Sequence, residues 1–401
     1  MTRADLSTTA RIDPGPDLLG AVASFGLPGA PELPSRLEVL HASALVSAAA
    51  TARLTGPLLA ACRAGQVELP GEVLHRLERS HRDSLLHCMR LEHELLDVDD
   101  VLQRHQVPFV VLKGPAVAHL DRSDPGDRAW SDIDILVPAG HIDRAVVVLT
   151  GVGATSTYAE RRPGWNRRFA KSVGLRSADQ IEIDVHRTLA DGVYGNRIPL
   201  DRLFATTETF DLAGRPFRSL SSPARVLHAA YHAVVGSLTP SWTTLRDLGI
   251  YFAEPTVPVA EVVAEARRWR GEAVLAEAVV LVRSRLGIEA SRWFDWVDDV
   301  EVDPRERLLV SRLRHGDAGL SGARLDLIRE LPSTSDRIAY IAGLAFPVGA
   351  EGSVLRRYRR WLPHVVRHRP VGRRPAPDTG RSGRRPPSGG EPPRPGTKPQ
   401  R

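Results

Sequence analysis

The sequence is short of cysteine and of long apolar runs. Cys62 and Cys88 are the only cysteines among its 401 residues. Two are too few for a disulfide framework or a cysteine-based zinc site, so we expect reduced thiols packed in helices. The first residues contain no apolar signal core. The longest uncharged apolar stretch, near residues 339–350, is shorter than the roughly 20 residues that span a bilayer. We therefore expect a soluble, cytoplasmic protein without membrane insertion.

Positive charge is concentrated at one end of the chain. The net charge is +6, but residues 366–401 alone hold ten Lys and Arg against two acids. The rest of the chain is therefore slightly negative. The same segment is rich in Pro and Gly, a composition that cannot bury a core, so we expect a disordered basic tail. The high isoelectric point does not mark the folded part as nucleic-acid-binding, although the tail is a candidate contact for nucleic acid.

Hydrophobic patterning divides the remainder into four segments. Residues 1–34 are rich in Pro and Gly and are expected to form a flexible leader. Apolar residues recur at helical spacing in residues 35–106 and again in residues 221–365. Residues 107–220 favour short strands with few helices, and this segment is too short for a doubly wound sheet. The pattern predicts an α+β fold, in which a small mixed β-sheet is flanked by N-terminal and C-terminal helical regions.

The central segment carries the strand signals. Apolar, β-branched runs bounded by Gly, Pro and Asp predict strands, and a Pro at a first helical position predicts a helix start. On this basis, strands are expected over residues 108–113, 130–138, 153–158, 172–177 and 181–187, with helices over residues 114–120 and 141–150.

Two acids share one face of the expected strand that contains the sequence SDIDILV. Side chains alternate along a strand, so Asp132 and Asp134 point to one side while Ile133 and Ile135 point to the other. Adjacent carboxylates repel one another unless a cation lies between them. The pair is therefore either a cation site or a solvated strand end.

A second strand has the same alternation. Glu182, Asp184 and His186 share one face, which is unusual for a half-buried sheet. If this strand lies beside the first, then Asp132, Asp134 and Asp184 converge. Three carboxylates form a hard-oxygen site suited to Mg²⁺ or Mn²⁺. Two such ions about 3.5–4 Å apart activate an attacking hydroxyl and neutralise a leaving phosphate.

A glycine turn precedes these strands. Lys113 and Gly114 follow an apolar strand and lead into a helix that starts near Pro115. Glycine lets the backbone approach a phosphate, and helix N–H groups bind anions. The spacing of a Walker A loop is absent. By itself the turn is equally typical of an ordinary strand–helix connection.

Two other clusters are weaker signals. Residues 161–168 (RRPGWNRR) are either a grip for an anion or, as we favour, a solvated hairpin loop. His228 and His232 have the i, i+4 spacing of a metal pair on a helix. No HExxH glutamate accompanies them, so helix packing or a supporting contact is the preferred interpretation.

Together these motifs resemble a bacterial family of uncharacterised nucleotidyltransferases, within the superfamily of DNA-polymerase-β-like nucleotidyltransferases. The resemblance covers roughly residues 36–360. Its motifs are LKG (residues 112–114), Arg128 before DIDILV (132–137), IDVH (183–186), a histidine-bearing helix (227–232) and LRDL (245–248). The resemblance implies that residues 107–220 form a nucleotidyltransferase core.

The chain departs from the better-known enzymes of the superfamily in its nucleotide grip. Those enzymes place Ser after the glycine, whereas this chain has Pro115, which offers no hydroxyl to a phosphate. The gap from Gly114 to Asp132 is also longer. Lys113 or Arg128 is a candidate replacement, although Lys113 could be a solvated strand end and Arg128 could pair with Asp127.

The resemblance implies a reaction and roles for residues. Asp132 and Asp134 would bind two Mg²⁺ (or Mn²⁺) ions and Asp184 the catalytic one, which makes all three catalytic metal ligands. A hydroxyl of an unknown acceptor would attack the α-phosphorus of an NTP, most simply ATP, and pyrophosphate would leave. Lys113, Gly114, Arg128 and Ser131 would bind the nucleotide. His186 would orient Asp184 or contact the acceptor, unless its role is structural.

Two other functions fit the same motifs. A toxin-type nucleotidyltransferase would act on tRNA or protein, and the basic tail favours a nucleic-acid partner. An accessory protein of a biosynthetic cluster would bind nucleotide without turnover, as Pro115 suggests. Three mutually repelling carboxylates argue against an inactive site.

Overall fold

The computed structural model describes residues 15–315 and 326–345. The predicted basic tail, residues 366–401, lies outside the described residues. None of the helices in the described part of the chain is long and apolar enough to cross a membrane.

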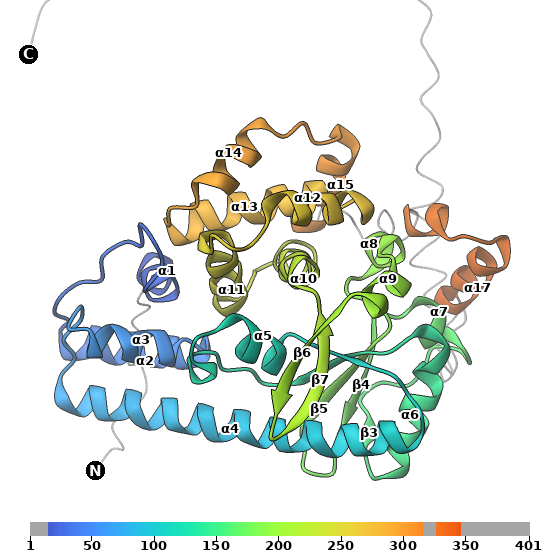
Figure 1. The fold of residues 1–401 in the computed structure, drawn as a ribbon, viewed down its shortest axis with the longest axis horizontal. Coiled ribbons are helices and arrows are strands. Elements are labelled where there is room, and N and C mark those ends of the chain that lie inside the picture. Colours follow the sequence, from blue (N-terminus) through green and yellow to red (C-terminus); the bar gives the residue numbers. More distant parts are fainter. Residues whose placement is uncertain (1–14, 316–325, 346–401) are drawn as a thin grey trace, which may run out of the picture. The chain divides into compact units, whose positions relative to one another are not determined.

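A mixed β-sheet forms the centre of the fold (Figure 1). Its strand order is β3-β4-β5-β2-β1-β7-β6. The β2–β5 and β1–β7 pairs are parallel, and the other neighbouring pairs are antiparallel. The strands are β1 (Val110–Leu112), β2 (Ile133–Leu136), β3 (Thr155–Ser156), β4 (Ser172–Arg176), β5 (Glu182–His186), β6 (Thr207–Leu212) and β7 (Arg215–Leu220). The predicted α+β fold with a small mixed sheet is confirmed.

Helices precede, connect and follow the strands. Before the sheet lie α1 (Pro16–Ser24), α2 (Val39–Thr51), α3 (Thr55–Arg63) and α4 (Gly71–Arg104). Between strands lie α5 (Gly114–Asp121), α6 (Ile142–Gly151), α7 (Trp165–Phe169), α8 (Gly192–Arg197) and α9 (Leu200–Ala205). After the sheet come α10 (Ser222–Val234), α11 (Trp242–Ala253), α12 (Val259–Arg268), α13 (Glu272–Leu286), α14 (Ser291–Asp299), α15 (Pro304–His315) and α17 (Thr334–Ala345).

The long helix α4 covers the apolar face of the sheet (Figure 1). Leu95 and Leu102 of α4 share one hydrophobic cluster with Ile133, Ile135 and Val185 of strands β2 and β5. Because side chains alternate, the carboxylates between these apolar residues point to the opposite face. There, Leu112 and Leu136 belong to the cluster that contains Leu227 of α10. The acidic face is therefore enclosed by the helices that follow the sheet.

The β6–β7 hairpin was not predicted. Its two-residue turn, Ala213 and Gly214, has positive φ values of 52° and 79°, the conformation of a tight hairpin. Phe210 and Phe217 face each other across the pair and are buried. Charged or other polar side chains and a proline occupy the intervening positions, which hid the alternation of apolar residues in the sequence.

The expected flexible leader is wrong for its second half. Residues Pro16–Ser24 form α1, a helix whose first turn begins at a proline. Val22 and Ala23 have no exposed surface and belong to the same cluster as Leu245 and Leu281 of α11 and α13. Pro and Gly are common before this helix and after it, which concealed a short amphipathic segment.

Residues 161–168 connect the antiparallel strands β3 and β4, as a hairpin loop would, but they are not the plain solvated loop that was predicted. The second half of this segment starts the short helix α7, against which α17 packs. Trp165 stacks on Tyr340 with ring centroids 5.2 Å apart, and Arg168 pairs with Asp336 at 2.5 Å. Arg162 donates to a backbone carbonyl of α17. Arg162 and Arg168 of this segment therefore bind a helix that is distant in the sequence.

A test of α1 uses two valines. Val22→Asp places an unpaired charge in the core, so we expect the free energy of unfolding to fall by about 3 kcal/mol or more. Val39→Asp, at a side chain that is 58% exposed, should change it by less than about 0.5 kcal/mol. Urea unfolding measures both, and equal effects would contradict a buried α1.

Candidate functional site

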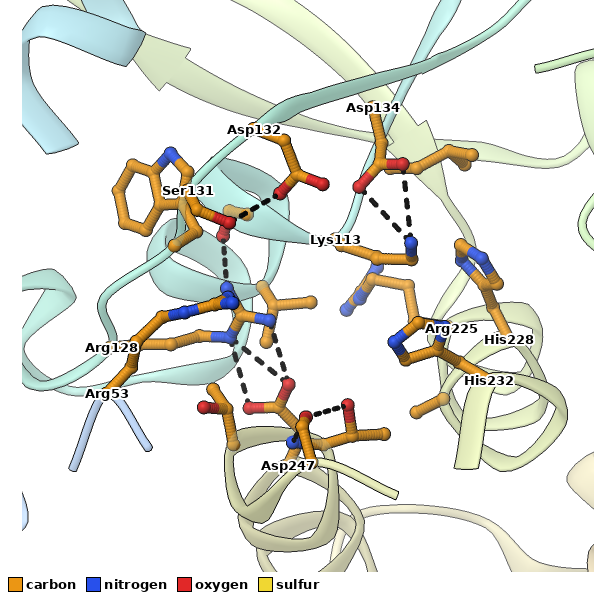
Figure 2. Close-up of a pocket in the computed structure, with 18 of the residues that line it drawn as sticks. Arg53, Lys113, Arg128, Ser131, Asp132, Asp134, Arg225, His228, His232 and Asp247 are labelled. Carbon is orange, nitrogen blue, oxygen red and sulfur yellow. Dashed lines mark hydrogen bonds and ion pairs between the residues drawn. The ribbon is translucent and has the colours of Figure 1, made fainter. Parts of the chain in front are cut away.

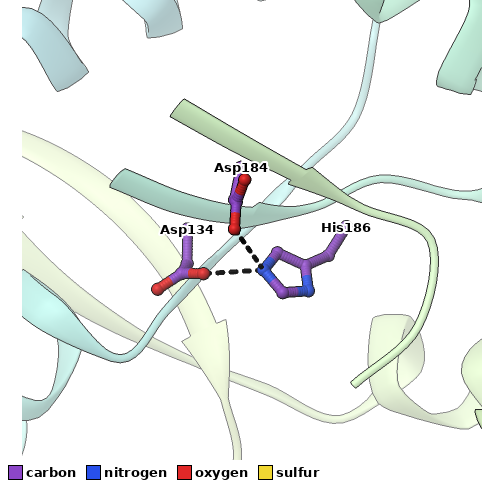
Figure 3. Close-up of side chains that lie close together, drawn as sticks. All are labelled: Asp134, Asp184 and His186. Carbon is purple, nitrogen blue, oxygen red and sulfur yellow. Dashed lines mark hydrogen bonds and ion pairs between the residues drawn. The ribbon is translucent and has the colours of Figure 1, made fainter. Parts of the chain in front are cut away.

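Two of the predicted acids are direct neighbours in the sheet. Strands β2 and β5 run parallel, and their register places Asp134 opposite Asp184. On the other side of Asp184, strand β4 places Gly174 opposite it. One oxygen from Asp134, one from Asp184 and one ring nitrogen of His186 all lie within 4.8 Å of one another (Figure 3).

Asp134 is the most buried of the three acids, with 3% of its side chain exposed. Its Oδ1 lies 2.6 Å from Nε2 of His186, and Lys113 Nζ lies 3.2 Å from Oδ2. An ionised carboxylate only accepts hydrogen bonds, so Nε2 carries the proton of this bond. Burial opposes the charge, yet Lys113 and His186 outweigh it and hold the pKa of Asp134 well below its usual range.

The glycine turn directs Lys113 at this carboxylate. Lys113 and Gly114 have positive φ values of 43° and 27°, so the chain turns sharply from β1 into α5. A Cβ at Gly114 would lie 3.2 Å from the Trp130 ring, which leaves little room for another residue. The Lys113 side chain is 22% exposed and paired. It is therefore not the solvated strand end that the sequence left open.

Asp132 lies just before β2 and is separate from the Asp134–Asp184–His186 group. Its Oδ1 accepts a hydrogen bond of 3.3 Å from the Ser131 hydroxyl. Burial, and then the charge of Asp134, raise the pKa of Asp132; Lys113 and Arg53 counteract part of this effect. The surrounding protein therefore balances a negative charge on this carboxylate only in part.

Asp184 is the most accessible acid of the Asp134–Asp184–His186 group. Its side chain is 40% exposed, and its Oδ2 lies 4.0 Å from His186 Nε2. The neighbouring Gly174 allows the Thr157 hydroxyl to pack closely, since a Cβ at position 174 would lie 2.5 Å from that hydroxyl and 3.4 Å from Asp184 Oδ1. Asp184 is therefore the acid that a reacting group can approach.

A cavity of about 250 Å³ opens beside these residues (Figure 2). It lies between the turn after β1, the entry to β2 and helices α10 and α11. Its charged and histidine lining residues are Arg53, Lys113, Arg128, Asp132, Asp134, Arg225, His228, His232 and Asp247. Gly114, Trp130 and Ser131 also line it. The predicted nucleotide-binding residues Lys113, Gly114, Arg128 and Ser131 thus share one cavity with Asp132 and Asp134.

Arg128 has a different partner from the one considered in the sequence. It pairs with Asp247 of α11, at 2.9 Å, rather than with Asp127. Its Nη1 donates to the carbonyl of Gly114 at 3.2 Å. Arg122 also pairs with Asp247, and all three side chains are more than nine-tenths buried. Asp247 therefore ties α11 to the glycine turn.

The two histidines of α10 line the cavity rather than form a metal pair. His228 is buried and its Nε2 makes no hydrogen bond in the described structure. Burial, followed by the charge of Lys113, lowers the pKa of His228 well below its usual value. The same two causes lower the pKa of His232 to about 3. Both imidazoles are therefore neutral at pH 7.

The donor set suits a divalent cation. Carboxylate oxygens are the ligands that Mg²⁺ and Mn²⁺ prefer, and an imidazole is acceptable to Mn²⁺. Asp134 is already balanced by an ammonium, which shows that this position requires a positive charge. Asp132 is outside the Asp134–Asp184–His186 group and lines the adjoining cavity together with Asp134.

Sequence reasoning identified Asp247 only as part of the LRDL segment and missed Arg53 and Arg225 entirely. Arg225 forms ion pairs with Asp121 and Glu208, each at 2.7 Å. No local pattern connects these residues to the acids, because they come from separate helices and a helix–helix turn.

Comparison with known proteins identifies one family. The family model described as uncharacterised nucleotidyltransferase matches residues 39–287, which include every strand and α2 to α13. The solution structure of the antibiotic-resistance factor ANT(2'')-Ia is 14% identical with a TM-score of 0.34, and the match covers 47% of this chain and 96% of that chain. An antigenic nucleotidyltransferase-like protein from Paracoccidioides brasiliensis is 13% identical with a TM-score of 0.29, covering 52% and 94%. No curated protein matches the sequence.

The buried pairing of Asp247 can be tested by stability. Asp247→Asn leaves Arg122 and Arg128 buried without a counter-charge, so the free energy of unfolding should fall by about 3–5 kcal/mol. Asp298→Asn breaks the exposed pair with Arg283 and should change it by less than about 1 kcal/mol. Chemical denaturation measures the free energy of unfolding of both variants, and similar losses in the two would contradict a structural role for Asp247.

The pairing of Asp247 with Arg122 and Arg128 also predicts a pH dependence of stability. Burial opposes ionisation, but Arg128 and Arg122 outweigh it and lower the pKa of Asp247 in the folded state. A lowered folded pKa stabilises the protein above the unfolded value of about 4, and this stabilisation is lost as the pH falls through the folded value. The wild type should therefore lose more stability on acidification below about pH 4 than Asp247→Asn does.

Proposed function

The chain belongs to the family of uncharacterised nucleotidyltransferases, and we propose that this enzyme transfers a nucleotidyl group from an NTP, most simply ATP, to an acceptor hydroxyl. The observation that supports this reaction best is the pairing of Asp134 with Asp184 on adjacent parallel strands. Asp132 lines the adjoining cavity together with the glycine turn. Such a cavity presents carboxylates for a cation and cations for a phosphate.

Asp132, Asp134 and Asp184 would hold Mg²⁺ or Mn²⁺, with His186 beside them. A divalent ion bound there would supply positive charge for the phosphate oxygens and for the attacking oxygen. Until then, Lys113 and His186 compensate Asp134 and keep its carboxylate ionised in place. The protein therefore preorganises the acids before any substrate is bound.

Asp184 is the acid best placed to accept the proton of the acceptor hydroxyl. It is more exposed than Asp134, and its Oδ2 lies 4.0 Å from the His186 nitrogen that binds Asp134. The hydroxyl oxygen forms a bond to the α-phosphorus, the bond from that phosphorus to the leaving pyrophosphate oxygen breaks, and the proton passes to Asp184. Catalysis then depends on positioning the reactants and on neutralising their charge, and the acidic and basic side chains of the cavity supply both.

The nucleotide would lie along the glycine turn. Lys113 provides charge, and Gly114 and Ser131 provide a small backbone turn and a hydroxyl at the cavity wall. Arg128 is occupied by Asp247 and by the Gly114 carbonyl. We assign it to holding the turn in shape, while its charge still faces the nucleotide.

The boundaries expected from the sequence remain proposals with this function. Residues 107–220 would be the transferase core, with helical regions at 35–106 and 221–365. A cytoplasmic location would give access to NTPs. The alternative is an accessory protein that binds nucleotide without turnover. It is favoured by Pro115, which offers no hydroxyl to a phosphate at the position after the glycine.

Replacement of single acids tests the reaction. Asp184→Asn should lower Mg²⁺-dependent pyrophosphate release by at least about 100-fold, since both the metal ligand and the proton acceptor are lost. Asp132→Asn and Asp134→Asn should do the same. Asp179→Asn, in the exposed turn that joins β4 to β5, is the matched control and should leave activity unchanged.

The measurement pairs a pyrophosphate assay with calorimetric binding of each NTP in the presence of Mg²⁺. Binding that requires Mg²⁺ and is lost in Asp132→Asn supports the transferase site. Full activity in the three variants would contradict it. Binding of NTP without release, across a range of alcohols, sugars and RNA, would favour the accessory protein.

Residues 366–401 offer a separate test of the acceptor class. If the acceptor is a nucleic acid such as tRNA, removal of this basic segment should weaken RNA binding, and the slope of affinity against salt concentration should become shallower. Filter binding at several salt concentrations measures this. Unchanged RNA affinity would exclude the tail from acceptor recognition.

A further inference from the structure

Arg53 lies far in the sequence from the strands that carry the acids. It lies in the turn between α2 and α3, before the long helix α4, and yet it lines the cavity with Lys113, Ser131 and Asp132 (Figure 2). Its charge acts on the carboxyl of Asp132, where it counteracts the effect of burial. An arginine outside the sheet core therefore faces the reaction site.

The other lysine and arginine side chains of the cavity already have acidic partners. Lys113 pairs with Asp134, and Arg128 pairs with Asp247. Arg225 is held between Asp121 and Glu208.

Arg53 differs from them. Among the described residues, its guanidinium forms no hydrogen bond and no ion pair. Because the cavity histidines His228 and His232 are neutral, Arg53 is the uncommitted positive charge of the described cavity lining.

The backbone holds Arg53 in place independently of its side chain. Its φ is 57°, in the left-handed region that residues other than glycine rarely occupy. Hydrogen bonds from its own N–H to Ala50 and from the Leu54 N–H to Ala49 close the end of α2. Ala49 and Leu54 are fully buried or nearly so, so packing on both sides fixes the turn. The side chain is thus free to meet a ligand.

A triphosphate needs such a charge at this position. Pro115 has neither a hydroxyl nor a backbone N–H, so the residue after Gly114 donates no hydrogen bond to a phosphate. Asp132 and Asp134 repel the polyphosphate until their charges are balanced. A guanidinium binds phosphate oxygens through two parallel hydrogen bonds, which an ammonium cannot do.

We propose that Arg53 binds the β- and γ-phosphates of the nucleoside triphosphate, so that the α2–α3 turn completes the donor site. This assignment rests on the proposed nucleotidyl transfer and names the residue that replaces the missing hydroxyl of the glycine turn. It also gives the N-terminal helices a direct role in substrate binding. The match to the family begins at residue 39 and includes this turn.

The test compares Arg53→Ala with Arg270→Ala. Arg270 is also an exposed arginine with a positive φ, 52°, just after a helix, and it lies outside the cavity. Calorimetry with Mg²⁺ and ATP, AMP or inorganic tripolyphosphate measures affinity. Arg53→Ala should weaken ATP and tripolyphosphate binding by about 10- to 100-fold and leave AMP binding unchanged. The affinity of Arg53→Lys for ATP and tripolyphosphate should lie between those of the wild type and Arg53→Ala, and the affinity of Arg270→Ala should equal that of the wild type.

A folding defect is separated from a binding defect by a second variant. Arg53→Gly removes the side chain but accepts the left-handed turn, so it should retain the thermal unfolding temperature and lose ATP affinity as Arg53→Ala does. If Arg53→Gly binds ATP and tripolyphosphate as the wild type does, the assignment is overturned.

The failure of this assignment is distinguishable from failure of the proposed function. Pyrophosphate release that depends on Asp184 but is unaffected by Arg53→Gly at low ATP would leave the transferase intact and refute the role of Arg53. Arg53-dependent binding of tripolyphosphate without nucleotidyl transfer to any acceptor would support the polyphosphate site and refute the reaction. Wild-type protein that binds neither ATP nor tripolyphosphate would refute both.

Discussion

The structure is organised around a carboxylate that is buried in the sheet and must stay charged. Asp134 is 3% exposed and lies next to Asp184 across a parallel strand pair. An uncompensated charge at such depth would be protonated or would destabilise the fold. Lys113 and His186 provide the compensation. The sharp turn at Lys113 and the histidine that ends the IDVH motif, His186, therefore both support one side chain.

A second group of charges links the sheet to the helices that follow it. Asp247 of α11 binds Arg122 and Arg128, and Arg128 also holds the carbonyl of Gly114. Buried ion pairs of this kind contribute less to net stability than to a defined geometry, since desolvation offsets much of their attraction. Their effect here is to fix the glycine turn relative to α11. The cavity wall and the acids are thus parts of one connected arrangement.

Short-range patterns in the sequence were sufficient for the centre of the site. The alternation in SDIDILV and EIDVH separated acids from apolar residues, and the structure places Ile133, Ile135 and Val185 in the cluster with α4. Patterns failed where amphipathic character was hidden by charge or by flanking Pro and Gly. The β6–β7 hairpin, the helix α1 and the docking of α17 on α7 all belong to this class.

The sequence by itself determined which side chains share a face of each strand, because alternation is a local property of the backbone. It also contained the family motifs, which match over residues 39–287. Only the tertiary structure decided which strands are neighbours and which charges meet. Arg128 pairs with Asp247, 119 residues away, rather than with the adjacent Asp127. Arg53 lines a cavity that is otherwise formed by residues from position 112 onward. Pairing between distant charges depends on the packing of whole helices, and no local periodicity encodes it.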